Sequence, residues 1–200
     1  MIGAFRHRLR ADQRGATLVE FALILPALMV LVLGIFDLSY NVYTNEMLQG
    51  AIQRGARAST LEGAAAQQTN IDDLVKAEVH TVAANATVTF ARKSYASFTA
   101  VGRPEDYSDI NANAVCDNGE PFEDANGNGA WDKDPGQAGF GGARDAVLYT
   151  VTVTYPRLVP VAAVIPGQNA NFTLQSSTVL RNQPFGVQSG TAAPAIANCP

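Results

Sequence analysis

The chain has 200 residues, of which 47% are hydrophobic and only 16% are charged, and its formal net charge is −4. This length fits one domain plus an anchor. The acidic balance argues against a surface that binds nucleic acid, because such a surface needs a basic patch.

The N-terminus combines a basic leader with a long apolar segment. Arginines stand at positions 6, 8, 10 and 14, and residues 21–36 carry no polar side chain. Counted from Ala16, the segment reaches the roughly 20 residues that a helix needs to cross a bilayer core. Arginine collects on the cytoplasmic side of a membrane, which predicts that everything after Asp37 lies outside the cytoplasm.

Glu20 is a charge near the start of this apolar segment, where a carboxylate is costly in lipid and therefore indicates a function. A cleaved secretory signal fits poorly, because residues 37–41 do not form a site of small residues. A plain signal anchor leaves Glu20 unexplained. A type IV prepilin-like leader explains it, because cleavage between Gly15 and Ala16 makes Glu20 the fifth mature residue.

The pattern resembles the TadE-like family of tight-adherence (Tad) pilus proteins over about residues 14–58. The matching stretches are Arg14-Gly15-Ala16, Glu20-Phe21-Ala22-Leu23, Leu25-Pro26, Gly34-Ile35-Phe36-Asp37, Leu48-Gln49-Gly50-Ala51 and Arg54-Gly55-Ala56-Arg57-Ala58. The resemblance implies a minor pilin or pseudopilin that a prepilin peptidase, a membrane aspartic protease, cleaves after Gly15. It also implies other pilins and an inner-membrane assembly platform as partners.

Glu20 then acquires a specific role. After cleavage the new amino group of Ala16 lies about one helical turn away. A charged pair between them, within one subunit or between neighbours, relieves the cost of a carboxylate in lipid. The alternative is an interfacial carboxylate that reaches the lipid headgroups.

Two helices are expected from the spacing of apolar residues. The first runs from Ala16 to about Ser59. Beyond Asp37, one of its faces is expected to carry Tyr40, Tyr43, Met47 and Ala51, with Leu48 and Ile52 beside them. The second covers residues 71–84, with Asn70 as its N-cap. Pro26 removes one backbone donor from the first helix and should loosen it there.

Strands are expected at residues 86–93, 146–155 and 171–181, with residues 95–101 as a hairpin partner of the first strand. The sequence therefore predicts an α+β fold: a long N-terminal transmembrane and packing helix, and a pilin-like head with a small antiparallel sheet. The expected divisions are a leader at 1–15, the helix at 16–60 and the head at 61–200.

An acidic loop at residues 116–135 has the oxygen spacing of a calcium site. Asp124, Asn126 and Asn128 alternate, Gly129 follows, and the Ala130 carbonyl and Asp132 complete positions 1, 3, 5, 6, 7 and 9 of such a loop. The twelfth position is Pro135 instead of a bidentate glutamate. We therefore expect that carboxylate from Glu120, Glu123 or Asp117. The alternative is a solvated turn without an ion.

Cys116 and Cys199 are expected to form a disulfide, since both lie outside the cytoplasm in the predicted topology.

No nucleophile elbow, P-loop or zinc-protease motif is present, so we expect no enzyme. The main alternative function is a surface-binding or adhesin module, stabilised by calcium, on a permanent signal anchor.

Overall fold

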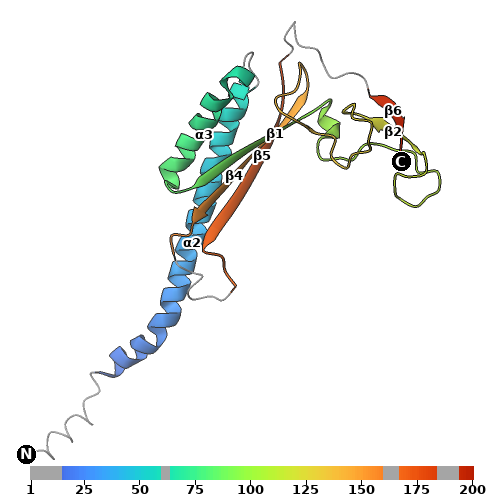
Figure 1. The fold of residues 1–200 in the computed structure, drawn as a ribbon. Helices are drawn as coiled ribbons and strands as arrows, with labels where there is room; N and C mark the ends of the chain where they lie inside the picture. The colour runs from blue at the N-terminus through green and yellow to red at the C-terminus, as the bar shows by residue number, and fades with distance from the viewer. Residues whose placement is uncertain (1–14, 60–63, 160–166, 184–193) are drawn as a thin grey trace, which may run out of the picture. The chain divides into compact units, whose positions relative to one another are not determined.

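The structure is a computed structural model that describes residues 15–59, 64–159, 167–183 and 194–200 (Figure 1). The basic leader, residues 1–14, lies outside the described residues. The chain divides into two compact units. One joins Met1–Tyr43 with Arg157–Ala170, and the other joins Thr44–Pro156 with Asn171–Pro200.

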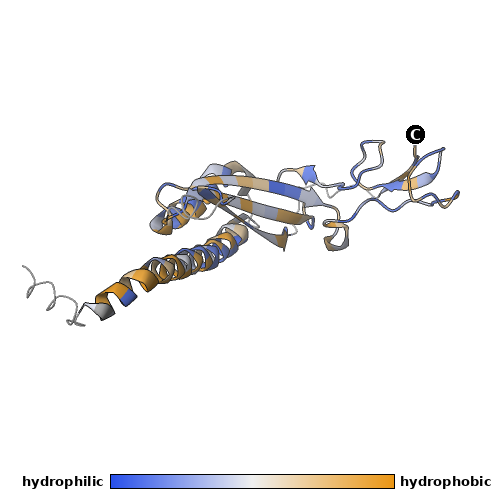
Figure 2. Ribbon diagram, turned by 90° about the horizontal axis from the view of Figure 1, so that it is seen from below, coloured by the Kyte–Doolittle hydropathy of each residue, from blue (hydrophilic) through white to orange (hydrophobic). Residues whose placement is uncertain are grey.

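Helix α2 (Ala16–Ser59) has the bounds that the sequence predicts, and it continues through Pro26. In its N-terminal half the large apolar side chains are exposed, including Leu23 at 77% and Phe36 at 65%. Figure 2 shows this half as predominantly hydrophobic. Among the described residues, α2 is the one helix long and apolar enough to cross a membrane.

The buried face of α2 agrees with the expected one only in part: Leu48, Ala51 and Ile52 are buried. Tyr43 is 55% exposed, whereas the buried positions carry Asp37, Asn41, Thr44 and Leu48. The polar members of this stripe can be buried because they have partners. Asn41 Nδ2 donates to Asp37 Oδ2 at 3.2 Å, and Arg157 forms an ion pair with the same carboxylate.

Helix α3 (Gln68–Val82) follows the short η1 (Ala64–Gln67) and begins three residues before the expected start. Its N-cap is therefore Gln67 and not Asn70, and Gln67 makes no capping hydrogen bond with its side chain. Of the apolar residues whose spacing predicts this helix, Ile71, Val75 and Val79 are buried, whereas Leu74 is 54% exposed.

The main sheet is antiparallel, with the strand order β3-β1-β4-β5. Its strands are β1 (Thr87–Tyr95), β3 (Gln137–Ala138), β4 (Ala146–Pro156) and β5 (Asn171–Arg181). The expected hairpin at 95–101 is wrong, because η2 (Phe98–Ala100) occupies that place and β1 pairs with β4 over its whole length. A partner that lies so far along the chain leaves no local turn signal.

The core of the second unit lies between the helices and β4. Val147, Tyr149, Val151, Val153 and Tyr155 are all buried, as their alternation predicts. Gly55 of α2 permits close packing there, because a Cβ at this position would lie 2.5 Å from Val75 Cγ2 and 3.6 Å from the Tyr149 ring. The compact head thus includes the last part of α2 from Thr44 onward.

A second, smaller sheet pairs β2 (Pro121–Asp124) with β6 (Ala195–Asn198) in antiparallel register. The sequence indicated neither strand. Both are four residues long, and each borders segments rich in Gly, Pro, Asn or Asp. The α+β class with an antiparallel head sheet is confirmed.

Candidate metal-binding loops and the N-terminal segment

Two loops of the head repeat the same pattern of oxygen-bearing side chains, fifteen residues apart. The second loop (124–132) is the one that the sequence singled out. The first loop (109–120) has Asp109, Asn111, Asn113 and Asp117 in the equivalent places. The sequence contains both copies, but the first loop has alanine where the second has glycine. A search for calcium loops that requires this glycine therefore misses the first copy.

The backbones of the two loops adopt the same left-handed turns. Ala112 and Ala114 have φ angles of 58° and 62°, and Gly127 and Gly129 have φ angles of 75° and 76° at the matching positions. Alanine in this region is strained, whereas glycine is not. The first loop therefore keeps the turn despite an unfavourable residue choice.

In the second loop, Asp124 accepts hydrogen bonds from the backbone of the turn. Gly127 N and Asn128 N donate to its Oδ1 at 2.7 and 3.1 Å, and Gly129 N donates to its Oδ2 at 2.8 Å. The amides of Asn126 and Asn128 both donate to Asp132 Oδ2 at 2.6 Å. All four side chains thus converge on the inside of the turn.

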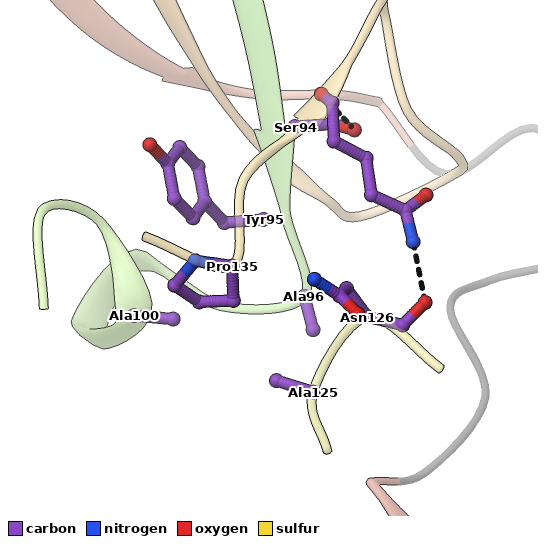
Figure 3. A pocket seen from close by; sticks show the side chains of 8 residues that line it. Ser94, Tyr95, Ala96, Ala100, Ala125, Asn126 and Pro135 are labelled. Carbon is purple, nitrogen blue, oxygen red and sulfur yellow. Dashed lines mark hydrogen bonds between the residues drawn. The ribbon is translucent and has the colours of Figure 1, made fainter. Parts of the chain in front are cut away.

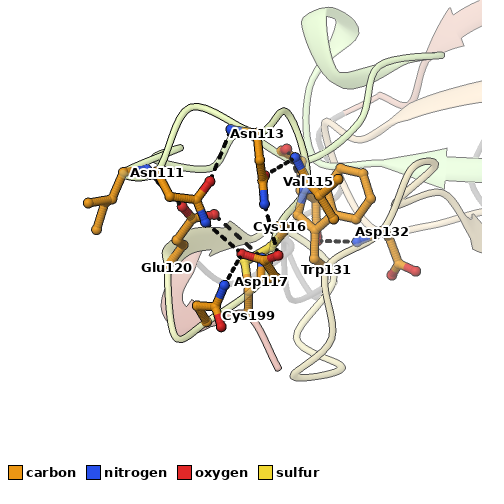
Figure 4. Close-up of a disulfide and its surroundings, with 12 residues drawn as sticks. Asn111, Asn113, Val115, Cys116, Asp117, Glu120, Trp131, Asp132 and Cys199 are labelled. Atoms are coloured by element: carbon orange, nitrogen blue, oxygen red, sulfur yellow. Dashed lines mark hydrogen bonds between the residues drawn. A yellow bond between two sulfur atoms is a disulfide. The ribbon is translucent and has the colours of Figure 1, made fainter.

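The first loop has the same arrangement (Figure 4). Asn113 N and Ala114 N donate to the Asp109 carboxylate at 3.1 and 2.8 Å. The amides of Asn111 and Asn113 donate to the two oxygens of Asp117, each at 2.9 Å.

Each loop also receives a buried glutamate. Glu120, at 2% exposure, accepts hydrogen bonds from Ile110 N at 2.7 Å and Asp117 N at 3.4 Å, which belong to positions 2 and 9 of the first loop. Glu105, at 4% exposure, accepts from Ala125 N and Asp132 N, both at 2.8 Å, which belong to positions 2 and 9 of the second.

The carboxylates proposed from the sequence for the second loop are therefore distributed differently. Glu120 and Asp117 contact the first loop, and Glu123 is exposed on β2. Glu105 takes the corresponding place in the second loop. It stands nineteen positions before Asp124, and no calcium-loop spacing points to it.

Negative charge accumulates in these loops without a described cation. The ion pairs among the described residues are Arg54–Glu78, Arg92–Asp72, Lys93–Asp134 and Arg157–Asp37, and none of them reaches Glu105 or Glu120. The pKa of the Tyr107 phenol is raised, first by desolvation and then by the charges of Asp109, Glu120 and Asp117.

The donor chemistry fits a hard cation such as calcium. In the described part of the chain no group of three or more His, Cys, Asp or Glu side chains converges as a metal cluster, so an ion here depends on amide and carbonyl oxygens as well. Rotation of each Asn amide by half a turn about χ2 replaces the nitrogen that now faces Asp117 or Asp132 with an oxygen. Oxygens in those positions repel the carboxylates unless a cation lies between them.

The predicted disulfide is confirmed: Cys116 in the first loop bonds to Cys199, with their Cα atoms 5.4 Å apart (Figure 4). Backbone hydrogen bonds reinforce the junction. Asn118 N donates to Pro200 O at 3.0 Å, and Cys199 N donates to Glu120 O at 2.8 Å. The C-terminus is thereby fixed to the first loop, while β6 also pairs with β2 as far as Asp124, where the second loop begins.

Aromatic side chains support the loops. Phe122 is 1% exposed. The Trp131 indole donates to Glu105 O at 2.9 Å and packs edge-on against Tyr107 at 5.7 Å between ring centroids. Trp131 therefore helps to place Glu105 beside the second loop.

Asp134 connects the second loop to the main sheet. Its carboxylate accepts from Lys93 Nζ at 2.5 Å and from the Tyr95 hydroxyl at 2.8 Å. The hydrogen bond from Lys93 lowers the pKa of Asp134. Burial and the neighbouring Asp134 raise the pKa of Tyr95 to about 12.

A gap of about 10 Å³ lies beside this junction, and Tyr95, Pro135 and Asn126 are among the residues that line it (Figure 3). Such a volume is barely enough for one water molecule. A more open hollow of about 240 Å³ lies nearby and is lined by Arg103, Asp106 and Glu123, among others.

At the N-terminal end of α2, Gly15 and Glu20 are both exposed. The helix starts here, because Val19 N donates to Gly15 O at 3.2 Å. Gly15, where the sequence predicts cleavage, and the Glu20 carboxylate one turn into the helix are therefore both accessible.

Residues 15–57 match the family model described as TadE-like protein. The N-terminal segment of this chain is TadE-like. The resemblance seen in the sequence is thereby confirmed over α2. No curated protein and no solved structure matches the chain.

The TadE-like match is confined to residues 15–57. It ends before α3, so the head with its two loops lies beyond the matched residues. The function of the TadE-like segment and that of the loops therefore rest on separate observations.

Proposed function

We propose that this chain is a minor pilin or pseudopilin, a structural component or assembly factor of a Tad-type pilus. The observation that carries this proposal is the TadE-like match at residues 15–57, on a helix whose apolar side chains are exposed. Such a helix first anchors the precursor in the inner membrane, with the head outside the cytoplasm. It then packs against other pilins in the pilus or at the assembly platform. The role is structural and not enzymatic.

A prepilin peptidase removes the leader after Gly15. A small residue is needed at the scissile position, so Gly15→Leu blocks the change in size that accompanies maturation in a host with a Tad system. Gly34→Leu is the matched control, because neither glycine has an atom within 4 Å of an added Cβ. Normal maturation of Gly15→Leu contradicts the proposed processing.

Glu20 pairs with the amino group of Ala16 on its own or a neighbouring subunit. Glu20→Leu therefore still inserts into the membrane but is depleted from sheared pili. Glu46→Leu, which removes another exposed carboxylate from the same helix, is the control. Wild-type incorporation of Glu20→Leu refutes this role.

The head binds calcium, and we extend the proposal to two ions. Asp109, Asn111, Asn113, Asp117 and Glu120 hold one, with the Val115 carbonyl at the seventh position. Asp124, Asn126, Asn128, Asp132 and Glu105 hold the other, with the Ala130 carbonyl. The repeated spacing and the two buried glutamates support this division.

Calorimetry on the purified chain tests the stoichiometry. We expect two calcium ions per chain, with dissociation constants of roughly 10⁻⁴–10⁻³ M, as in other extracellular modules. Asp109→Ala with Asp117→Ala removes one ion, and Asp124→Ala with Asp132→Ala removes the other. Absence of calcium heat in the wild type leaves both loops as turns held by hydrogen bonds alone.

The same loops favour a second candidate function, a calcium-stabilised adhesin module on an anchor that is never cleaved. A head braced by ions and a disulfide suits exposure at a cell surface. The two functions differ at the N-terminus of the mature protein, which is Ala16 for a pilin and Met1 for a permanent anchor.

A further inference from the structure

The second loop contains two Asn-Gly pairs, Asn126-Gly127 and Asn128-Gly129. The backbone nitrogen of the residue after an asparagine can attack the side-chain amide, and glycine hinders this attack least because it has no Cβ. The attack closes a five-membered succinimide ring and releases ammonia. It is accelerated by a base that accepts the proton of the attacking N–H, and by a donor to the oxygen on which negative charge develops.

Both groups surround Asn126. The attacking nitrogen, Gly127 N, donates to Asp124 Oδ1 at 2.7 Å, which is within the reach of a general base. Asn128 N donates to Asn126 Oδ1, the oxygen that becomes negative, at 3.0 Å. Asn126 Nδ2, the leaving nitrogen, donates to Asp132 Oδ2 at 2.6 Å. The amide is therefore held at both of its polar atoms.

Asn128 has the same surroundings. Gly129 N donates to Asp124 Oδ2 at 2.8 Å, and Ala130 N donates to Asn128 Oδ1 at 2.7 Å. Asn128 Nδ2 donates to Asp132 Oδ2 at 2.6 Å. Asp124 thus receives both attacking N–H groups, one on each of its oxygens.

We propose that Asn126 and Asn128 are sites of self-catalysed deamidation, with Asp124 as the base. Asp124 takes the proton from the glycine nitrogen as the bond from that nitrogen to the asparagine Cγ forms. The bond from Cγ to the side-chain nitrogen then breaks, and this nitrogen regains the proton and leaves as ammonia. Water opens the ring on either side of the glycine nitrogen. One product is aspartate, which calcium loops accept at these positions, and the other is isoaspartate, which adds a carbon atom to the backbone.

The first loop surrounds Asn113 in the same way but has a different next residue. Ala114 N donates to Asp109 Oδ2 at 2.8 Å, and Val115 N donates to Asn113 Oδ1 at 2.7 Å. The methyl group of Ala114 hinders the attack that glycine permits. The strained alanine therefore protects Asn113, which gives this residue choice a chemical reason.

A third Asn-Gly pair, Asn118-Gly119, is an internal control with the same dipeptide in other surroundings. Gly119 N donates to a carbonyl, Cys199 O, at 3.2 Å and not to a carboxylate. Within the described ranges no donor reaches Asn118 Oδ1. Asn118 should therefore react without assistance.

Peptide-resolved mass spectrometry of the purified full chain tests the proposal. The chain is incubated at mildly alkaline pH with a chelator, so the result does not depend on the proposed calcium sites. Because a positioned base typically contributes about 10²–10⁴-fold, Asn126 and Asn128 should convert at least about 10-fold faster than Asn118 in the folded chain. In denaturant the three rates should converge. Equal rates in the folded chain overturn the proposal.

Variants separate the parts of the proposal. Gly129→Ala should slow conversion of Asn128 by about 10-fold, which corresponds to about 1.4 kcal/mol in the barrier. The reciprocal variant, Ala114→Gly, should make Asn113 convert at a rate similar to that of Asn128 in the wild type. An Asn113 that stays intact in this variant contradicts the proposed assistance. Asp124→Asn should slow both sites of the second loop, and unchanged rates overturn its role as the base.

Discussion

The two loops of the head have the same backbone and the same donors, yet they are secured in different ways. The first loop (109–120) carries its glutamate at its own twelfth position, is bonded through Cys116 to the C-terminus, and contains alanine in left-handed conformations. The second loop (124–132) takes Glu105 from an earlier segment and has glycine at the corresponding places.

This difference shows that the same turn can form with alanine or with glycine at its left-handed positions, and with a glutamate from inside or from outside the loop. In the first loop, the disulfide and a local glutamate offset a backbone that its alanines disfavour. In the second loop, the glycines adopt the turn without strain. A glutamate from outside the loop is therefore enough to hold the turn, and no disulfide is needed. Variants that exchange these features test whether the two loops are equivalent.

The disulfide gives the largest expected effect. Cys116→Ser with Cys199→Ser removes a bond between residues 83 positions apart. Loss of a native disulfide typically costs about 2–5 kcal/mol of stability. Amide hydrogen exchange should increase in the first loop and β6 and change little in the second loop. Equal loss of protection in both loops contradicts their separate support.

The two glutamates give the next effect. Glu120→Gln should weaken calcium binding at the first loop alone, and Glu105→Gln at the second alone. We expect at least about a 10-fold loss at the affected site, since even outer partners of metal sites give 10–100-fold losses. Calorimetry with each variant measures this. A Glu105→Gln variant that binds both ions as the wild type does would show that Glu105 is only a structural acceptor.

The alanine at the bend of the first loop gives a smaller effect with the opposite sign. Ala114 has a left-handed backbone conformation, which costs a non-glycine residue about 1–2 kcal/mol, and Ala114→Gly removes this cost while the conformation stays. The apo protein should gain up to this amount of stability in denaturant unfolding. Gly129→Ala is the reciprocal variant and should lose a similar amount of stability. Open space surrounds the added Cβ, so the left-handed backbone alone causes this loss. A loss of stability in Ala114→Gly would contradict the proposed strain.

The ion pair between the second loop and the sheet gives the smallest effect. The pKa of Asp134 is lowered by Lys93, so its contribution to stability is present above the usual pKa of a carboxyl group and is lost as the pH falls through the lowered value. Lys93→Met should therefore flatten the acid side of the pH profile of thermal melting. The pair is exposed, so the change should stay below about 1 kcal/mol. An unchanged acid profile would show that the pair contributes nothing.

The sequence predicts the elements whose signals are local. The bounds of α2 and β5 and the buried face of β4 follow from apolar periodicity. The partner of β1 does not, because β4 begins about fifty residues later. Polar residues on the buried face of α2 also escape the pattern, since Arg157 compensates Asp37 only after folding.

The candidate site follows the same rule. The second loop can be found from spacing and glycine. The first loop has the spacing without the glycine, and Glu105 has neither. What could not be predicted depends on tertiary placement: the indole of Trp131 holds the Glu105 backbone, and this brings the carboxylate to Ala125 N and Asp132 N.

The pilin assignment is tested most directly by the N-terminus of the mature protein. We would purify the chain from the membranes and sheared pili of a host with a Tad system and determine its intact mass and terminal sequence. The account predicts a chain that starts at Ala16, with Glu20 as its fifth residue. A chain that still starts at Met1 in both fractions would contradict it and favour the permanent anchor.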